Sequence, residues 1–332
     1  MSLRLSIVVP VHGVEDYLVQ CLDSLRASGS ASVEIIAVDD ASPDSCGDIL
    51  DRYAGIKVIH LDGNVGLGLA RNAGLAQATG DYVWFVDSDD WVPPGSIKAV
   101  LDELAASEPD VLLIDHLRAY DDGRREVDAS SHLLAGPVTL DRVLGVQHTA
   151  WNRIVRRSLL LGHDLQFRPG WYEDVPFSLP VLLAASRIAV LNRVCYYYRI
   201  GRAGAITATR SDRHFEAFTQ YDRLQEWLAG HHVAPEVRAR LFHLMINHLL
   251  VVAGNDGRMH PSRRRAFFRQ LAASYRRYRP AGYRPGLRHR LVAAGNYPLY
   301  SLLRAAYRAR APRSAAPAMA ARSSAPTVAT IV

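Results

Sequence analysis

The chain has 332 residues, of which 49% are hydrophobic and 22% charged, a composition typical of a globular protein with one large domain or two of ordinary size. No apolar run approaches the roughly 18 residues that a membrane-spanning helix needs, and the N-terminal segment MSLRLSIVVP is too short and strand-like for a secretory signal. Three widely spaced cysteines without metal-ligand spacing favour a reducing, cytoplasmic setting.

The net charge of +6 is unevenly distributed along the chain. Of the 39 basic residues, 16 are arginines between Gly257 and Val332, a segment without lysine or acidic residues, so residues 1–256 retain 23 basic and 33 acidic side chains, a net charge of −10. An acidic body with a basic C-terminal arm predicts a polyanionic partner, either nucleic acid or an anionic membrane surface.

The first 120 residues alternate short β-branched runs with helical patterns. The predicted strands are 5–11, 33–40, 56–61, 81–87 and 110–117, and the predicted helices are 16–27, 43–53, 67–78 and 94–106. Near-continuous apolar strands separated by helices indicate an α/β fold with a mostly parallel sheet covered on both faces. Ligands of such sheets bind at the carboxyl ends of the strands.

Three of these strand ends carry Pro10–His12, Asp39–Asp40 and Asp87–Asp90. Carboxylates so close together raise one another's pKa or need a cation. A D-x-D pair such as Asp87 and Asp89 can hold Mg²⁺ or Mn²⁺, which are often shared with substrate phosphates. A solvated acidic turn is the alternative. The missing GxxxxGK[ST] and GxGxxG patterns disfavour a P-loop nucleotidase and a dinucleotide-binding domain.

The remainder of the chain is less regular up to residue 212 and then becomes helical. The patterns predict a hairpin turn at 121–126, a helix at 173–186, a strand at 193–200 and a Gly/Arg-rich loop at 201–207. Helices are predicted at 213–230, 235–253, 261–279 and 286–310, and the Ala/Ser/Pro-rich segment 311–332 is predicted to be disordered.

Three segments together carry a resemblance to a known family: SIVVPVHGVEDYLVQCLDSL, EIIAVDDASPDS and NVGLGLARNAGLAQATGDYVWFVDSDDW. They resemble the nucleotide-sugar-binding half of family 2 glycosyltransferases, which have the Rossmann-like GT-A fold. WYEDVPFSLPVLLAAS and YYYRIGRAGAIT extend the resemblance to about residue 210. It implies a nucleotide-sugar-binding half at 1–120 and an acceptor-binding, catalytic half at 121–212. The helical pattern and the composition then predict a basic helical extension at 213–310 and a disordered tail at 311–332.

The resemblance also implies a donor site. The residues implied to bind the nucleotide-sugar are Pro10, Val11, His12, Glu15, Asp39, Asp40, Arg71, Asp87, Ser88 and Asp89. In this family the first acid of D-x-D contacts the ribose or the sugar and the second ligates Mg²⁺ or Mn²⁺ on the diphosphate, so Asp89 and Asp87 are the expected metal site. Asp40 resembles the acid that binds the nucleobase. His12-Gly13 replaces the family's common tyrosine-asparagine pair, which leaves the base identity open.

Several of these residues also have a structural interpretation. Arg71 can form a surface ion pair, Glu15 can be a helix-start charge favoured by the helix dipole, and His12 can be an ordinary loop histidine.

Glu173 and Asp174 form a second acidic centre at the start of a predicted helix. The hydroxyl that attacks the sugar must lose a proton, and a carboxylate can act as its general base while a metal stabilises the leaving diphosphate. By resemblance Asp174 is the base and Glu173 binds or supports the acceptor; the reverse assignment and a helix cap remain alternatives. Single displacement would invert the anomeric configuration.

Two further pairs are implied with looser motif agreement. Arg199, at the end of the strand 193–200, and Arg202, in the loop after it, suit a diphosphate or a lid, because guanidinium groups form forked hydrogen bonds with phosphates. Trp151 and Asn152 stand where relatives place pocket residues, so Trp151 is either a sugar platform or a core residue.

The segment 257–310 interleaves arginines with Tyr, Phe and Leu, the composition of an amphipathic segment at a membrane interface. We therefore expect peripheral association with the anionic inner face of the cell membrane. A solvated, arginine-rich helical subdomain is the alternative.

The main hypothesis is an inverting, metal-dependent glycosyltransferase of cell-envelope or exopolysaccharide synthesis. It would move a sugar from a nucleoside-diphosphate sugar, with UDP-sugars favoured, to a glycan or polyprenyl-phosphate-linked acceptor. The alternatives are a nucleic-acid- or membrane-binding protein that uses the basic arm, an inactive GT-A scaffold, and a nucleotidyltransferase. Because the N-terminal two-thirds is acidic and carries no recognised nucleic-acid module, no nucleic-acid partner is expected.

Overall fold

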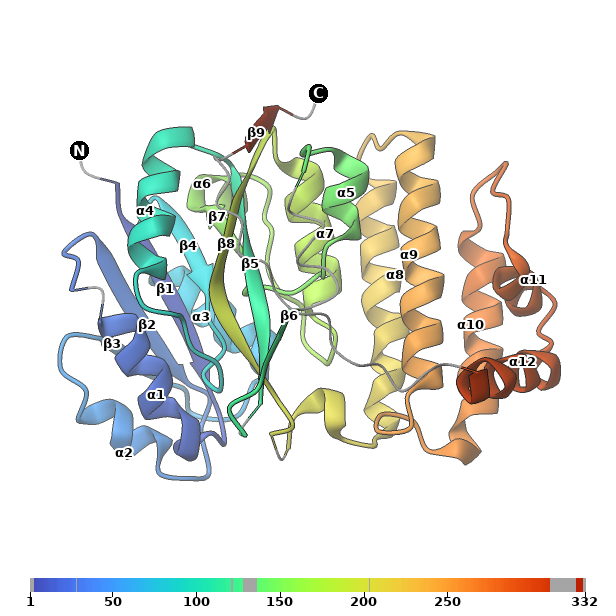
Figure 1. Cartoon of the computed structure of the whole chain (residues 1–332), viewed down its shortest axis with the longest axis horizontal. Coiled ribbons are helices and arrows are strands. Elements are labelled where there is room, and N and C mark those ends of the chain that lie inside the picture. Colours follow the sequence, from blue (N-terminus) through green and yellow to red (C-terminus); the bar gives the residue numbers. More distant parts are fainter. Residues whose placement is uncertain are drawn as a thin grey trace. The chain divides into compact units, whose positions relative to one another are not determined.

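The computed structural model describes residues 3–27, 29–120, 122–127, 136–202, 204–310 and 327–330. The chain divides into two compact units, Met1–Ile200 with Ala320–Val332 and Gly201–Met319. We call them the α/β unit and the helical unit (Figure 1). No helix among the described residues is long and apolar enough to cross a membrane.

A single mixed sheet forms the α/β unit. Its described strands are β1 (Leu5–Val11), β2 (Val33–Asp39), β3 (Lys57–His60), β4 (Tyr82–Phe85), β5 (Val111–Tyr120), β6 (Arg125–Val127), β7 (Arg153–Arg156), β8 (Arg187–Ile200) and β9 (Thr327–Thr330). The order is β3-β2-β1-β4-β7-β5-β8-β9, with β6 paired to β5. The β1–β2, β1–β4, β2–β3 and β5–β8 pairs are parallel, so the carboxyl ends of β1, β2 and β4 meet at one edge.

Helices cover both faces of this sheet. On one face α1 (Glu15–Arg26), α2 (Cys46–Asp51) and α4 (Ser96–Ser107) share a buried cluster with alternate strand residues such as Ile7 and Trp84. On the other face lie α3 (Leu67–Ala76) and α7 (Asp174–Ala184). There Phe177 of α7 meets Phe85 edge-on at a centroid distance of 5.7 Å. The remaining helices of the unit are α5 (Leu140–Gly145) and α6 (Arg157–Gly162).

This architecture confirms the predicted α/β fold with a mostly parallel core sheet, as well as the hairpin between β5 and β6. Sequence patterns missed β7, which inserts antiparallel between β4 and β5. Its four residues, RIVR, alternate apolar and charged side chains, too short a run to show a period. The predicted strand 193–200 is also longer, because β8 starts at Arg187.

The C-terminal strand β9 corrects part of the predicted disordered tail. Thr327–Thr330 pairs antiparallel with Arg187–Val190 of β8, the strand beyond β5 in the sheet. The unpaired backbone N–H and C=O groups at the edge of a sheet can bind another extended segment. The sequence TVAT favours a strand, because threonine and valine are β-branched. The rest of the predicted tail lies outside the described residues.

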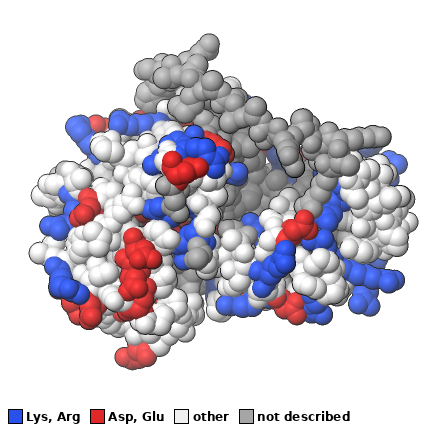
Figure 2. Space-filling view, turned by 60° about the horizontal axis from the view of Figure 1, so that its bottom comes forward, with Lys and Arg blue, Asp and Glu red and all other residues white. Residues whose placement is uncertain are grey.

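The helical unit packs its main helices around α10. Their bounds are α8 (Glu216–Ala229), α9 (Pro235–Gly254), α10 (Arg264–Tyr278), α11 (Leu287–Ala293) and α12 (Tyr297–Arg310). Phe267 of α10 packs on Phe218 of α8 at a centroid distance of 4.6 Å, and Tyr275 of α10 on Phe242 of α9 at 5.0 Å. On the face shown in Figure 2, basic side chains gather over this unit.

The single helix predicted for 286–310 is wrong, because the structure has two helices there. Gly295 takes a positive φ of 65°, which glycine adopts without steric cost, and it follows the last turn of α11. Pro298 then occupies the second position of α12, where its missing N–H disrupts no helical hydrogen bond.

Candidate functional site

A buried arginine joins the two acidic centres that the sequence places 86 positions apart. Arg71 of α3 is 1% exposed. Its Nη2 donates to Asp87 Oδ1 at 2.7 Å, and its Nη1 donates to Glu173 Oε1 at 2.8 Å and to Asp174 Oδ1 at 3.1 Å. We call these four residues the Arg71 cluster. The end of β4 and the start of α7 therefore form one site.

The glycines and the asparagine of the α3 motif GLGLARNAG explain how α3 comes so close to both. A Cβ on Gly74 would lie 2.3 Å from Val8, so only glycine lets α3 reach β1 at this point. A Cβ on Gly68 would lie 3.0 Å from the Glu173 side chain. Asn72 exchanges two hydrogen bonds with the backbone of Phe167, at 2.9 and 3.0 Å, and so holds the segment before α7 against α3.

Strained backbone stands directly before the second acidic centre. Tyr172 has a φ of 66°, a left-handed conformation that a bulky side chain rarely adopts. It precedes Glu173, whose carboxylate is turned to Arg71. Residues in such conformations cluster at functional sites, where the surrounding structure holds them.

Burial and neighbouring charges shift the pKa values of Arg71, Glu173 and Asp174. Burial raises the pKa of Asp174 to about 8, with Arg71 lowering it and Glu173 and Asp87 raising it further. Burial also raises the pKa of Glu173 against the pull of Arg71. For Arg71, burial alone would lower the pKa, but the carboxylates of Asp87, Asp174 and Glu173 raise it above its usual value. A carboxylate with a pKa near neutral is suited to accept a proton.

The loop that carries D-x-D is fastened to β8 through a buried tyrosine. Tyr196 donates from its hydroxyl to Asp90 Oδ2 at 2.7 Å and accepts the backbone N–H of Asp87 at 3.1 Å. The second Asp90 oxygen accepts the backbone N–H of Arg199 at 2.7 Å. Burial, followed by the charges of Asp89 and Asp87, raises the pKa of Asp90 well above its usual value. Asp90 therefore supports the loop, while Asp87 and Asp89 remain partly exposed at its surface.

Arg199 is held beside this loop. Its guanidinium carbon lies 4.6 Å from the ring centroid of Tyr17 and 4.6 Å from that of Trp91. Its Nε donates to the backbone oxygen of Asp89 at 2.8 Å. These contacts bring Arg199 to the predicted metal site. Arg202 lies in the helical unit, and its predicted diphosphate or lid role stays a prediction.

The predicted nucleotide-binding residues gather at the ends of β1 and β2, and several already have protein partners. The Asp40 carboxylate accepts the backbone N–H groups of Val65 and Gly66 at 2.6 and 2.8 Å, just before α3. The exposed His12 places Nδ1 3.0 Å from the backbone oxygen of Asp40. Pro10 and Val11 are buried in β1.

Asp39 and Glu15 likewise order the loops at this edge. Asp39 accepts the Ser42 N–H at 2.9 Å and lies 2.9 Å from His60 Nδ1, a contact that raises the pKa of His60. Glu15 accepts the backbone N–H of Ser45 at 2.9 Å. Ser88, between the D-x-D acids, is buried. Glu15 lies in the first turn of α1, where the dipole interpretation places it, and its contact with Ser45 also fixes the loop before α2.

Trp151 and Asn152 lie in the core rather than at an open surface. Trp151 is 2% exposed and stacks on Tyr196 with ring centroids 4.5 Å apart, so little of its ring is left for a sugar. Asn152, also buried, donates to the backbone oxygen of Gln147 at 2.7 Å. The structure supports the core alternative for Trp151.

Sequence and structure comparisons find the same relationship. A sequence model described as Glycosyl transferase family 2 matches residues 6–157. EpsH of Bacillus subtilis, named as a glycosyltransferase, is 28% identical over 273 residues, which cover 78% of this chain and 79% of EpsH. Residues 6–157 of the chain are a family 2 glycosyl transferase domain.

Other glycosyltransferases are similar to this chain over part of their length. The poly(ribitol-phosphate) beta-N-acetylglucosaminyltransferase TarS of Staphylococcus aureus is 32% identical over 210 residues, 61% of this chain but 36% of TarS. The crystal structure of S. aureus TarS 1-349 in complex with UDP has a TM-score of 0.70 at 22% identity and covers 94% of this chain and 93% of that chain. That likeness confirms the GT-A fold.

The residues at the predicted metal site of this glycosyltransferase fit a hard divalent cation. Asp87 and Asp89 are partly exposed carboxylates at a strand end, and Mg²⁺ and Mn²⁺ are commonly held by one or two carboxylates together with substrate phosphates. Among the described residues, no group of three or more His, Cys, Asp or Glu side chains is arranged as a metal site by itself. Two carboxylates would therefore have to share the ion with the donor.

Sequence analysis missed two residues of this site. Nothing in the strand sequence YYYRI distinguishes Tyr196, the tyrosine that points to Asp90, from its neighbours. Arg153 of β7 is fully buried, and its burial lowers its pKa to about 10, with Asp174 opposing that shift. Its guanidinium donates to the backbone oxygens of Ser178 and Gln147 at 3.1 and 3.0 Å.

Replacing Tyr196 with phenylalanine tests the fastening of the D-x-D loop. The hydroxyl is buried, and its loss leaves the Asp87 N–H and one Asp90 oxygen without this partner, so we expect a destabilisation of about 1–3 kcal/mol in urea unfolding. Tyr197→Phe is the matched control, because its ring contact with Trp91 at 5.4 Å is kept. Equal stability of the two variants would contradict the fastening role.

Proposed function

We propose that the protein is an inverting glycosyltransferase that moves a sugar from a UDP-sugar to a hydroxyl group of a cell-envelope acceptor. One observation carries the proposal: Arg71 holds Asp87 of the donor-side motif and Asp174 of the second acidic centre on the same guanidinium. Displacement of a sugar requires a group that binds the donor and a base for the acceptor to lie side by side. The Arg71 cluster supplies both.

Support for the donor comes from related proteins. Structures of S. aureus TarS 1-349 in complex with UDP and in complex with UDP-GlcNAc match this fold with TM-scores of 0.70 and 0.59. In the present chain the nucleotide would lie at the ends of β1 and β2, beside His12 and Asp40. His12 has an exposed ring with which a base can stack.

Catalysis then follows from the placement of the carboxylates. Asp174 would take the proton from the acceptor hydroxyl as that oxygen attacks the anomeric carbon, and attack from the face opposite the leaving UDP inverts the configuration. Glu173, bonded to the same Arg71 Nη1, would fix the orientation of Asp174 and support the acceptor. Asp89 and Asp87 would hold Mg²⁺ or Mn²⁺, which neutralises charge on the leaving diphosphate when bound.

The acceptor class is proposed from the names of relatives. They include the TarS transferase named for poly(ribitol-phosphate), and a Bacillus spizizenii poly(ribitol-phosphate) beta-glucosyltransferase that is 31% identical over 218 residues. This chain spans about a third of the length of each. We propose a glycan or polyprenyl-phosphate-linked acceptor, reached from the cytoplasm at the inner face of the cell membrane.

UDP release tests the proposed function. With a panel of UDP-, GDP- and dTDP-sugars and Mn²⁺ or Mg²⁺, we expect slow release of UDP from one UDP-sugar, and loss of that release in EDTA. Asp89→Asn should lower it strongly, because a carboxamide is a poor ligand for a hard cation. Asp122→Asn, an exposed hairpin carboxylate, is the control and should match the unaltered protein. Release of pyrophosphate in place of UDP would instead indicate a nucleotidyltransferase.

A further inference from the structure

Helix α12 has two apolar faces, and one of them packs inside the helical unit. Tyr297 and Tyr300 lie against Phe268 of α10, with ring centroids 5.5 and 5.0 Å apart. Arg304, one turn further along the same face, donates to the backbone oxygen of Gly254. This inner face anchors the helix.

The opposite face of α12 carries leucines that face away from this packing. Leu299, Leu302 and Leu303 recur at i, i+3 and i+4, which places them on one side of a helix, and they are 41%, 66% and 39% exposed. Leu287, at the start of α11, is 64% exposed. Of the eight large hydrophobic side chains exposed in the described part of the chain, these four lie within 17 positions. Single exposed leucines are ordinary on protein surfaces, but a group of them marks an interaction site.

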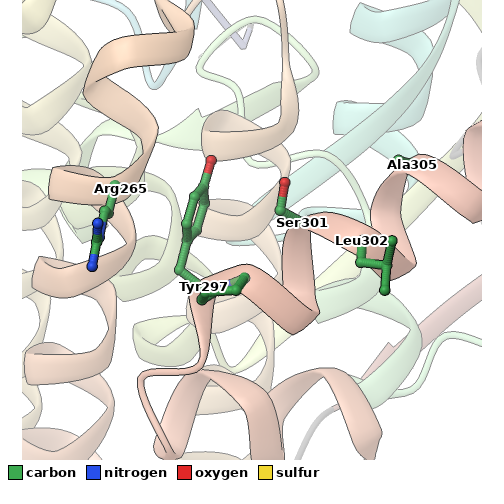
Figure 3. A pocket seen from close by; sticks show the side chains of 6 residues that line it. Arg265, Tyr297, Ser301, Leu302 and Ala305 are labelled. Atoms are coloured by element: carbon green, nitrogen blue, oxygen red, sulfur yellow. The ribbon is translucent and has the colours of Figure 1, made fainter.

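A groove continues this surface between α10 and α12. It is open to solvent, has a volume of about 560 Å³ and is lined by Arg265, Tyr297, Pro298, Ser301, Leu302 and Ala305. Figure 3 shows Arg265 on one side of the groove, across from the Tyr297 ring, with Ser301 and Leu302 further along α12. One end thus offers a guanidinium and the other offers apolar carbon.

The segment that carries these leucines is basic. Arg284, Arg288 and Arg290 are exposed on α11 and the segment before it, and Arg265 and Arg269 are exposed on α10. Between Gly257 and Arg310 the sequence has no aspartate or glutamate. Exposed leucines in a segment whose acidic and basic residues are all arginines match a bilayer surface, which offers an apolar interior below anionic headgroups.

We propose that α11 and α12 form a membrane-docking face that inserts Leu287, Leu299, Leu302 and Leu303 between anionic lipids. The choice of a membrane as the partner rests on the proposed function, because an enzyme that acts on a membrane-bound acceptor must reach the membrane surface. Nucleic acid fits this face less well, because bases are held by exposed aromatic rings and Tyr297 and Tyr300 are turned to α10. The groove beside Arg265 suits one lipid headgroup and part of its chain.

Flotation of the full chain with vesicles tests the docking face. Vesicles with phosphatidylglycerol should carry the protein upward in a density gradient, and pure phosphatidylcholine vesicles should carry much less. The triple variant Leu299→Ser/Leu302→Ser/Leu303→Ser should lose roughly tenfold or more in the partition constant, because three buried apolar side chains are removed. Val251→Ser, at a 59% exposed position on α9, is the matched control and should float normally.

Two results would overturn the docking face: flotation of the triple variant at the level of the unaltered protein, or equal flotation on neutral and anionic vesicles. Displacement of the protein from vesicles by a short RNA at stoichiometric amounts would also overturn it, in favour of nucleic acid. UDP release by the same variants, measured without vesicles, is a separate readout. If the triple variant loses flotation but keeps its UDP release and its melting temperature, the leucines act in membrane docking alone. If no protein releases UDP, including the unaltered one, the proposed function is wrong whatever the flotation result.

Discussion

Asp174→Asn should lower the turnover number for sugar transfer by roughly 10²–10⁴-fold while leaving UDP binding nearly unchanged, because general bases contribute about this much. An asparagine keeps the shape of the side chain and can still meet Arg71, but it cannot take up the proton of the attacking hydroxyl. Transfer kinetics and UDP titration by calorimetry measure the two effects separately. Since this variant removes the charge and keeps the volume, a loss of UDP binding would point to a role in the donor site.

Glu173→Gln is the matched control for that variant. Glu173 lies beside Asp174, and both bond the same nitrogen of Arg71 at 2.8 and 3.1 Å. If Asp174 is the base, Glu173→Gln should retain measurable turnover, with its loss mainly in the affinity for the acceptor. The opposite ranking of the two variants would assign the base to Glu173.

The pH dependence of transfer provides a second readout of the same prediction. Burial raises the pKa of Asp174 to about 8, and a base works only in its unprotonated form. The value of kcat/KM should therefore rise with pH through about 8 and level off above it. In Asp174→Asn this rising limb should disappear from the residual activity. A flat profile in the unaltered enzyme between pH 6 and 9 would contradict the assignment.

The elements of the fold that could be predicted from the sequence are those with a recognisable local pattern of residues. Strand β1, with its run LSIVVPV, and the acids after β2 and β4 could be placed because parallel strands present their carboxyl ends together. Strand β7 could not be predicted, because its four residues form a strand through pairing with β4 and β5, which are distant in the sequence. The division between α11 and α12 depends on the conformation of Gly295.

The arrangement of side chains in the site likewise depends on long-range packing that the sequence does not predict. The sequence motif around Arg71 could be recognised. It does not show whether the guanidinium group lies beside a diphosphate or is buried among carboxylates. The difference comes from Gly68 and Asn72, which bring the segment before α7 against α3. Trp151 is similar, since its stacking on Tyr196 depends on the pairing of β8 with β5. The environments of Arg71 and Trp151 both depend on tertiary packing, which local sequence patterns do not show.

Arg71→Met should be the most destabilising change in the site, at about 3–5 kcal/mol near pH 8, because it leaves buried carboxylates without their counter-charge. Urea unfolding at several pH values measures the effect. Arg156→Met is the control: that arginine pairs with Asp110 at 3.2 Å in a partly exposed position, so about 1 kcal/mol or less is expected. A similar loss in both variants would mean that Arg71 acts as an ordinary ion pair.

The pH dependence of that destabilisation distinguishes lost charge from lost packing. Glu173 and Asp174 have pKa values above their usual ones, so between about pH 4 and 8 the folded state binds more protons than the unfolded state, and stability falls as pH rises. Without Arg71 the two pKa values should rise further and this slope should steepen. At pH 5 both acids can be protonated and buried without a counter-charge, so the difference between Arg71→Met and the unaltered protein should shrink. A pH-independent difference would show that Arg71 stabilises the site through the packing of its chain on Phe167, 5.1 Å from the guanidinium carbon, and the three acids would then owe their proximity to Gly68 and Asn72 alone.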